Sequence, residues 1–425
     1  MSTPYPDSVR FLYALGNEYK TIKFGLDRIR TLLDALGRPQ DACRFIHVAG
    51  TNGKGSTCAM LERVLRCAGL RTGLYTSPHL IEPTERVRID GQPVSTEQFA
   101  AAFSLVHDTA ERLLSAAAID MHPTYFETVT AMAFVLFRDL GAQTVVLETG
   151  MGGRLDATNV VDPMLSVITP IDFDHEKFLG DTIPQIAREK AGIIQPGRPA
   201  VTSRQHPAAL HVLEARAAET GSALLSAAAW RVDHLELHPY GSRFHAAGPG
   251  SGVEVDCPLI GAHQVENALT AIAALNHLGF TPGQIAGGIA ATEWPGRLER
   301  AGSAPDIFLD GAHNPAGARA LAGYIRHFHH GRRIWMVFAA MRDKNLATIC
   351  PLLFPLASEL IFTAPAQSRA YLATEIRQIS GESRARVTAG TAEALALVRQ
   401  AQPGDAVFIT GSLYLVGEAR ALLMG

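Results

Sequence analysis

The chain has 425 residues, of which 47% are hydrophobic and 19% are charged. This composition excludes a disordered chain and is typical of a globular protein with a large core, and the length favours two domains over one. The 38 Lys and Arg residues and the 41 Asp and Glu residues leave a net charge of -3, so we expect no nucleic-acid partner bound through its phosphate backbone. No stretch approaches the ~18 consecutive apolar residues that a membrane span needs, so we expect no membrane association.

The cysteines are five in number and scattered, and they include no C-x-x-C pair. Such a set predicts neither a disulfide framework nor a structural zinc site, and it is typical of a reducing compartment. The first seven residues, MSTPYPD, lack the basic and apolar regions of a secretory signal. We therefore expect a cytoplasmic protein.

Strand-like apolar runs alternate with amphipathic stretches along most of the chain, which is the pattern of a parallel sheet with crossover helices. Between residues 230 and 257 the pattern is shorter, polar-alternating and glycine-rich, which predicts an antiparallel segment. In chain order, the other expected elements of the first part are strand 44–49, helix 54–68, strand 72–76, helix 124–140, strand 144–148, strand 165–169, helix 183–192 and helix 263–278.

The segment 293–297 (EWPGR) places Pro and Gly between two regular regions, which predicts a domain joint. A new alternation then begins, with strand 306–309, helix 315–327, strand 334–338, strand 359–363, helix 373–379, strand 406–410 and a final helix. We therefore predict an α/β fold. A P-loop-type parallel-sheet ATPase domain would span residues 1–296, and a smaller Rossmann-like α/β domain would span residues 297–425.

A glycine-rich loop, 50–56 (GTNGKGS), joins the first predicted strand to the first predicted helix. Glycines let the backbone turn tightly and direct N–H groups at an anion, and the helix N-terminus adds its positive end. Lys54 can reach the β- and γ-phosphates of a nucleotide, and Ser56 can face Mg²⁺. The usual Walker pattern is not met, because Val48 takes the place of its first glycine and Gly55 separates Lys54 from Ser56. A turn without a ligand is the alternative, but Lys, Ser, strand and helix together favour phosphate binding.

Polar residues stand at the ends of the predicted strands: Ser77, Glu148, Asp172, Asp174 and His175. The carboxyl ends of parallel strands form one edge of a sheet, where ligands collect. Oxygen ligands suit Mg²⁺, and a histidine can take a coordination position. Each residue alone has an ordinary structural explanation, but their common placement favours a metal site beside the phosphate loop.

Three other features have structural interpretations from the residues alone. Lys190 stands near the end of a predicted helix, where the macrodipole favours a cation. Segment 124–127 (TYFE) fits a capping box at a helix start. The cluster His327, His329 and His330 is interpreted as a solvated helix end rather than a metal site.

Taken together, these motifs resemble the Mur-ligase superfamily, and within it the folylpolyglutamate synthase/dihydrofolate synthase family. The resemblance covers nearly the whole chain. It rests on the ordered segments 47–56, 76–80, 85–88, 124–127, 148–159, 188–193, 295–297, 310–315 and 411–414. The missing Walker glycine is explained as well, because the loop of that family is G-T-N-G-K-G-[ST].

The resemblance implies an ATP-dependent amide ligase with two Mg²⁺ sites. A carboxylate of dihydropteroate, of a folate's glutamyl chain, or of both would attack the γ-phosphate of ATP, and L-glutamate would displace phosphate from the resulting acyl phosphate. Because a carboxylate and a triphosphate repel each other, Mg²⁺ and Lys54 must neutralise charge along the transfer line. A small second domain on a Pro-Gly joint would exclude water from the intermediate.

The resemblance also implies a role for each matching residue. The ATP-binding set is Thr51, Asn52, Gly53, Lys54, Gly55, Ser56, Asn267, Arg297 and Asp310. The first Mg²⁺ would be bound by Ser77 and Glu148, and the second by His175, Lys190 and Glu148, with Lys190 carbamylated and therefore anionic. The pterin site would comprise Thr124, Phe126, Asp156 and Ala157, and the glutamate side His313 and Ser412. The groups expected to act in the reaction are Lys54, Lys190, His175 and His313.

Two alternatives remain open beside this one. Another Mur-type ligase, acting on a nucleotide-linked cell-wall precursor, would need a further domain for the uridine nucleotide, and only about 43 residues precede the first predicted strand. A P-loop ATP-binding protein or kinase without ligation would turn over or bind ATP independently of glutamate. For the ligase we expect a monomer with small-molecule substrates.

Overall fold

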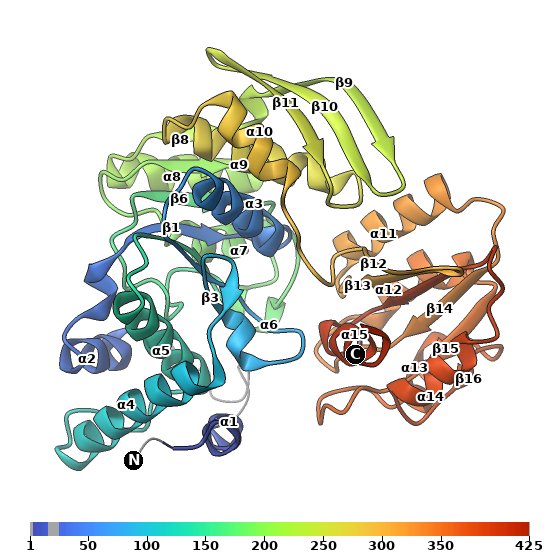
Figure 1. Ribbon diagram of the computed structural model, residues 1–425, viewed down its shortest axis with the longest axis horizontal. Coiled ribbons are helices and arrows are strands. Elements are labelled where there is room, and N and C mark those ends of the chain that lie inside the picture. The colour runs from blue at the N-terminus through green and yellow to red at the C-terminus, as the bar shows by residue number, and fades with distance from the viewer. Residues whose placement is uncertain (1–2, 16–24, 425) are drawn as a thin grey trace.

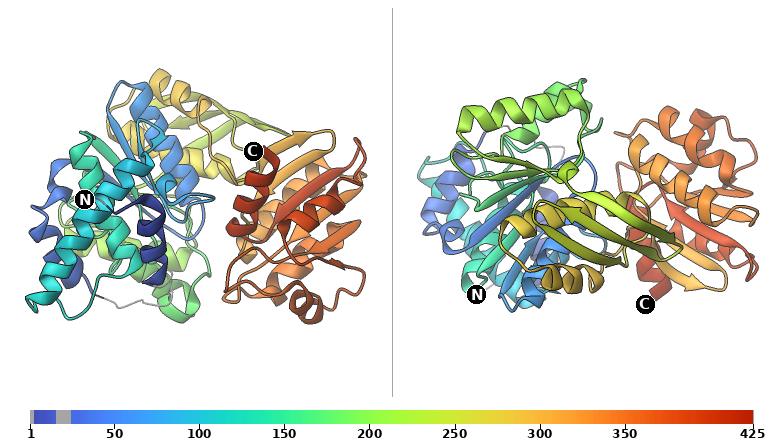
Figure 2. Two further views of the ribbon diagram at one scale, coloured as in Figure 1. Left: turned by 60° about the horizontal axis from the view of Figure 1, so that its bottom comes forward. Right: turned by 90° about the horizontal axis from the view of Figure 1, so that it is seen from above.

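The structure of the protein, a computed structural model, describes residues 3–15 and 25–424 (Figure 1). Two large sheets dominate it, each covered by helices on both faces, and the two parts lie side by side (Figure 2). The α/β fold predicted from the sequence is confirmed.

The first sheet has eight strands in the order β4-β3-β2-β5-β1-β6-β7-β8. Six of these run parallel, and β3 and β4 form an antiparallel edge beside β2. The strands are β1 (Arg44–Ala49), β2 (Thr72–Tyr75), β3 (Val87–Ile89), β4 (Gln92–Pro93), β5 (Thr144–Glu148), β6 (Leu165–Ile168), β7 (Ala200–Thr202) and β8 (Leu224–Ser226).

Helices cover both faces of this sheet because its central strands are apolar on both sides. Along β1, Ile46 and Val48 pack into one core cluster with α3, α9 and α10, whereas Phe45 points to the other face, into the cluster of α2, α4 and α5. The helices of this part are α1 (Tyr5–Ala14), α2 (Asp27–Ala35), α3 (Lys54–Cys67), α4 (Thr96–Ser115), α5 (Tyr125–Asp139), α6 (Glu176–Leu179), α7 (Ile183–Ala191), α8 (Pro207–Thr220), α9 (His263–His277) and α10 (Pro282–Ala290).

The predicted antiparallel segment is a three-stranded sheet of order β11-β10-β9. Its strands are β9 (Arg231–His238), β10 (Gly241–Gly248) and β11 (Ser251–Cys257). Phe244, Val253 and Val255 point into the core that also holds α9 and α10. The alternation of buried and exposed residues in β11 is the sequence pattern that predicted it.

The second large sheet has six strands in the order β12-β13-β17-β14-β15-β16, all parallel except β12. Helices α11 to α13 cover one face and α14 and α15 the other. The strands are β12 (Glu299–Ser303), β13 (Asp306–Asp310), β14 (Ile334–Phe338), β15 (Glu359–Phe362), β16 (Arg386–Val387) and β17 (Ala406–Thr410). The helices are α11 (Pro315–Phe328), α12 (Leu346–Leu353), α13 (Ala373–Ser380), α14 (Thr391–Val398) and α15 (Leu413–Met424).

The last helix brings the two parts into direct contact. Gly417 of α15 lies so close to the carbonyl oxygen of Leu80 that an added Cβ atom would stand 1.9 Å from it. Only a residue without a side chain permits this approach, so Gly417 sets how closely α15 packs on the loop after β2.

One sequence interpretation is wrong. His329 is buried, with 4% of its surface exposed, and its ring contacts Phe308 and Phe408. Burial lowers the pKa of His329 to about 4. The cluster with His327 and His330 is therefore not uniformly solvated, because the chain turns His329 back into the core at the end of α11.

No helix in the described ranges is both long and apolar enough to cross a membrane.

Candidate active site

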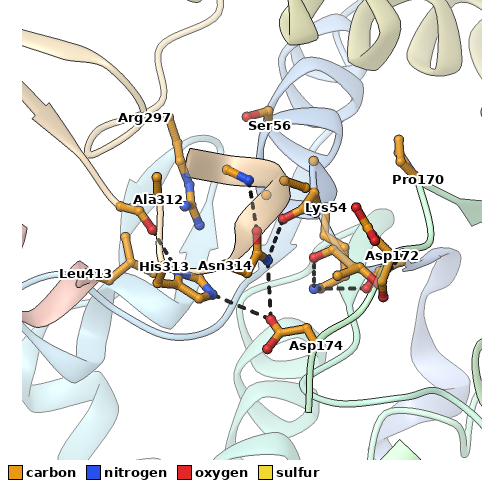
Figure 3. A pocket seen from close by; sticks show the side chains of 18 of the residues that line it. Lys54, Ser56, Pro170, Asp172, Asp174, Arg297, Ala312, His313, Asn314 and Leu413 are labelled. Carbon is orange, nitrogen blue, oxygen red and sulfur yellow. Dashed lines mark hydrogen bonds and ion pairs between the residues drawn. The ribbon is translucent and has the colours of Figure 1, made fainter. Parts of the chain in front are cut away.

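A cavity of about 400 Å³ lies between the two parts of the chain (Figure 3). It is lined by the loops that follow β1, β2, β5 and β6 in the first sheet and by the loops that follow β13, β14 and β17 in the second. The residues predicted from the sequence that line it are Thr51, Asn52, Gly53, Lys54, Gly55, Ser56, Ser77, Glu148, Asp172, Asp174, His175, Lys190, Asn267, Arg297, Asp310, His313 and Ser412. The strand-end residues therefore do meet the phosphate loop.

The phosphate loop is held in shape by α9. Gly53 has φ +83°, and a Cβ atom there would stand 2.2 Å from Asn267 Oδ1, so only glycine fits between the loop and α9. Asn267 Nδ2 donates to Gln264 Oε1 (2.9 Å), and Gln264 Nε2 donates to Ser56 Oγ (3.3 Å). These contacts connect the loop to α9 at the start of α3.

Two lysines converge on the carbonyl oxygen of Gly50 in this loop. Lys54 Nζ donates to it at 3.2 Å and also to the Thr51 carbonyl at 3.3 Å. Lys190 Nζ donates to the same Gly50 oxygen at 2.8 Å. Burial first, and then the charge of Lys54, lower the pKa of Lys190 to about 7. A substantial fraction of Lys190 is thus neutral at neutral pH.

The macrodipole does not account for Lys190. Lys190 is 4% exposed, and its side chain extends from α7 to the phosphate loop rather than into water. The position of a lysine near a helix end carries no information about the surface on which that helix packs, so the sequence pattern alone could not place it here.

Glu148 ends β5 inside the cavity and is 4% exposed. The backbone N–H of Ser77 donates to Glu148 Oε2 at 3.2 Å. Burial raises the pKa of Glu148, although the charge of Lys54 opposes this rise. The site therefore contains a carboxylate whose ionised form is costly unless a cation compensates it.

Asp174 links the two parts of the chain. It lies 2.7 Å from Lys344 Nζ. Asn314 Nδ2, at 3.4 Å, and His313 Nε2, at 3.6 Å, also face Asp174 (Figure 3). All three residues belong to the second part of the chain. Burial by itself would raise the pKa of Asp174, but the neighbouring His313, His175 and Lys344 hold it well below its usual value. The carboxylate therefore stays ionised and binds the second part to the first.

A second set of contacts supports this link. Asn314 Nδ2 donates to Asn52 Oδ1 at 2.9 Å, and Arg319 Nη2 donates to Asp172 Oδ2 at 3.2 Å. Lys344, Asn314 and Arg319 were not predicted as site residues. Lys344 and Asn314 do follow β14 and β13, so their strand-end position was the available signal.

Asp310 stands at the end of β13 and is buried. Its two carboxylate oxygens accept hydrogen bonds from the backbone N–H groups of Leu298 and Ala312, each at 3.0 Å. Burial raises the pKa of Asp310, with the charge of Arg297 opposing the rise. Next to it, His313 Nδ1 lies 2.7 Å from the Gly311 carbonyl oxygen, which turns Nε2 toward Asp174.

The residues predicted for the pterin site do not line this cavity, but two of them contact residues of its wall. Phe126 packs against Gly150, where an added Cβ would stand 2.5 Å from the ring. Asp156 Oδ2 accepts from the Met151 backbone N–H at 2.8 Å. Gly150 and Met151 themselves line the cavity. Ala157 is buried beside Asp156.

Thr124 has the capping role that its motif predicts. Thr124 Oγ1 accepts from the Glu127 N–H at 3.2 Å, and Glu127 Oε2 accepts from the Thr124 N–H at 2.8 Å. Arg28 from α2 also donates to Glu127 Oε2, with Nη2 at 2.7 Å. This buried pair holds the start of α5 against α2.

Both parts of the chain match known ligase families. Residues 48–275 match the Mur ligase middle domain, and residues 296–413 match the Mur ligase glutamate ligase domain. With a phosphate loop on one side of the cavity and the ligase domain on the other, the protein is an ATP-dependent ligase of the Mur type.

The similarity to characterised relatives extends over the full length. A folylpolyglutamate synthase of Lacticaseibacillus casei is 36% identical over 430 residues, with 99% of each chain covered. A dihydrofolate synthase/folylpolyglutamate synthase of Bacillus subtilis is 35% identical, with 100% of each chain covered. The structure of a Mycobacterium tuberculosis folylpolyglutamate synthase, complexed with ADP and AMPPCP, superposes with a TM-score of 0.91 at 34% identity, with 99% of each chain covered. The chain belongs to the folylpolyglutamate synthase/dihydrofolate synthase family of the Mur ligase superfamily, as its motifs predicted.

Proposed function

We propose that the enzyme joins L-glutamate to the carboxyl group of dihydropteroate, of a folate's glutamyl chain, or of both, through an acyl phosphate formed with ATP. The observation that carries this proposal is the composition of one cavity. Lys54, Glu148 and Lys190 enter it from the first part, and Arg297 and His313 enter it from the second. A phosphate loop alone would serve a kinase equally well, whereas a cavity completed by a ligase domain favours joining two substrates.

The proposed division of labour follows the two parts of the chain. Residues 1–296 would bind ATP and the pterin substrate, and residues 297–425 would bring glutamate. The loop 51–56 would hold the phosphates, with Asn267, Arg297 and Asp310 as further ATP contacts. His313 and Ser412 would face glutamate. Both sides of the cavity come from one chain, which supports a monomer, and the unpaired cysteines support a cytoplasmic setting.

The pterin ring is proposed to bind near Phe126, Thr124, Asp156 and Ala157. Phe126 offers a flat surface for stacking. Because Phe126 and Asp156 contact the cavity wall at Gly150 and Met151, a shift of this wall would connect the ring site to the phosphate site. A structure with a bound pterin would test whether the ring reaches and stacks on Phe126.

The residues around Glu148 fit a divalent cation that prefers oxygen ligands. A buried carboxylate with a raised pKa is stabilised in its ionised form by a cation, and Ser77 offers a hydroxyl beside it. We propose Ser77 and Glu148 as ligands of one Mg²⁺, and Glu148, His175 and carbamylated Lys190 as ligands of another. When bound, Mg²⁺ would supply charge neutralisation for the triphosphate.

Carbamylation of Lys190 is supported by its surroundings. The pKa of about 7 leaves a neutral amine, which is the form that adds to carbon dioxide. The product is an anion, and it would replace repulsion between Lys190 and Lys54 by attraction. A cationic Lys190 beside metal ions would instead repel them.

In the proposed reaction, Lys54 holds and neutralises the γ-phosphate while a carboxylate oxygen of the substrate attacks the γ-phosphorus and ADP leaves, which gives the acyl phosphate. The glutamate amine then attacks the acyl carbon, and inorganic phosphate leaves. Because the acyl phosphate is open to hydrolysis, the contacts of Asp174 with Lys344 and Asn314 serve to keep the two parts together and water out.

A phosphate-release assay tests this function. We expect ATP consumption by the purified enzyme only when both L-glutamate and either dihydropteroate or a reduced folate are present. Running each pterin separately, with product analysis, decides which acid is used. Equal phosphate release without glutamate would favour the kinase or ATP-binding alternative.

A further inference from the structure

Two histidines and a glutamate that do not line the cavity form a cluster between α4 and the segment that precedes α5, two helices that Figure 1 labels. His107 and Glu111 stand four residues apart on α4, and therefore on one face of the helix, and His122 lies on the segment that leads into α5. One ligand atom from each side chain lies within 4.8 Å of the other two. His122 Nε2 and Glu111 Oε1 are 3.8 Å apart.

Each histidine presents a nitrogen that makes no hydrogen bond within the described parts of the chain. His122 Nδ1 lies 2.9 Å from the Pro123 carbonyl oxygen. Since a carbonyl oxygen only accepts, Nδ1 carries the proton and Nε2 keeps a lone pair. His122 Nε2 and His107 Nδ1 are both buried atoms without a hydrogen-bond partner. Buried polar atoms of this kind are costly unless something pairs with them.

The two rings are already held in place by aromatic packing. His107 stacks on Phe103 with ring centroids 5.4 Å apart and planes 6° apart. Phe11 of α1 contacts both rings, at 4.5 Å from His107 and 5.5 Å from His122. A backbone hydrogen bond that fixes one imidazole nitrogen while the other points to a shared centre is the usual support of a metal-binding histidine.

From this arrangement we propose that His107, Glu111 and His122 bind a divalent transition-metal ion, with zinc as the best match to two imidazoles and a carboxylate. Metal–ligand distances of about 2.0–2.2 Å place the ligand atoms of a tetrahedral site roughly 3.3–3.6 Å apart. Rotation of the half-exposed Glu111 side chain would close the remaining gap. The scattered cysteines argue only against a zinc site with cysteine ligands. The ligands proposed here are two histidines and a glutamate, and none is a cysteine.

The function of the proposed site is structural. It would bind α4 to the segment just before Thr124, and thus support the start of α5 without taking part in ligation. Because the ion would bind the folded chain and not the unfolded chain, it would raise the free energy of unfolding.

Cobalt is the probe for the test, because its visible absorption reports histidine ligation. The full-length protein is stripped with a chelator, returned to excess Mg²⁺ so that sites preferring Mg²⁺ are filled, and titrated with Co²⁺. We expect wild type to bind one more equivalent of Co²⁺ than His107→Gln or His122→Gln, and we expect Zn²⁺ to displace this ion and raise the Tm of wild type only.

Two further variants complete the experiment. Glu111→Gln changes a side chain that is 54% exposed, so it should fold normally, and we expect it to weaken Co²⁺ affinity by more than about tenfold. His245→Gln is the matched control, because His245 pairs with exposed Glu254 at 2.7 Å on the β10–β11 ladder, and it should bind Co²⁺ as wild type does. Equal stoichiometry and affinity in wild type, Glu111→Gln and His122→Gln would overturn the proposal.

Discussion

Replacing Lys54 with methionine is expected to lower kcat by about 10²–10³-fold, because a fixed charge that stabilises transferring phosphate is worth that much. Methionine keeps nearly the length of lysine and removes the charge. In the structure Lys54 already lies at the phosphate loop, held by the Gly50 and Thr51 carbonyl oxygens. Steady-state rates of phosphate release with saturating ATP measure the effect.

The matched control is Lys177→Met, which removes a lysine that is exposed on α6 and does not line the cavity. Its kcat should stay near that of wild type. A Lys54→Met enzyme with an unchanged kcat and only a raised KM for ATP would show that Lys54 binds the nucleotide without assisting transfer.

Replacing Lys190 with alanine is expected to lower the rate by a comparable factor of about 10²–10³, because the proposed carbamate would be lost as an anionic ligand beside the triphosphate. The loss should be partly reversed by a small carboxylate such as acetate, which can occupy the vacated space with an oxygen donor. Rates are measured with increasing acetate at constant ionic strength.

Rescue of Lys190→Ala by a small amine instead of acetate is the result that would contradict carbamylation. If Lys190 acts as a cation that supports the Gly50 carbonyl oxygen, a small alkylamine should restore activity to Lys190→Ala and acetate should not. Rescue by the amine alone would contradict carbamylation while leaving amide ligation intact.

The sequence predicted the fold well where local patterns determine it. Strand β1, the loop 50–56 and helix α3 follow directly from an apolar run, glycines and an amphipathic stretch. Helices α1, α2 and α4 were not predicted, although Ser95 and Gln98 form a capping box at the start of α4. This start signal, together with the apolar stretch that follows it, is sufficient to predict α4.

The sequence indicates which residues gather at the candidate site, but it does not indicate which of them contact one another. Parallel-sheet topology brings Ser77, Glu148 and His175 to the phosphate loop, because all follow strands at one edge. The burial of Lys190 depends on how α7 packs, and the contact of Asp174 with Lys344 depends on how two sheets face each other. Neither relation has a signature within a short stretch of sequence.

Oxygen tracing tests the central claim of acid activation by phosphoryl transfer. The substrate acid is labelled with ¹⁸O in its reacting carboxyl group and turned over with ATP, Mg²⁺ and L-glutamate, and the released phosphate is analysed by mass spectrometry. If an acyl phosphate forms, each phosphate carries one oxygen from the substrate. Phosphate without that label, formed together with the amide product, would contradict the account.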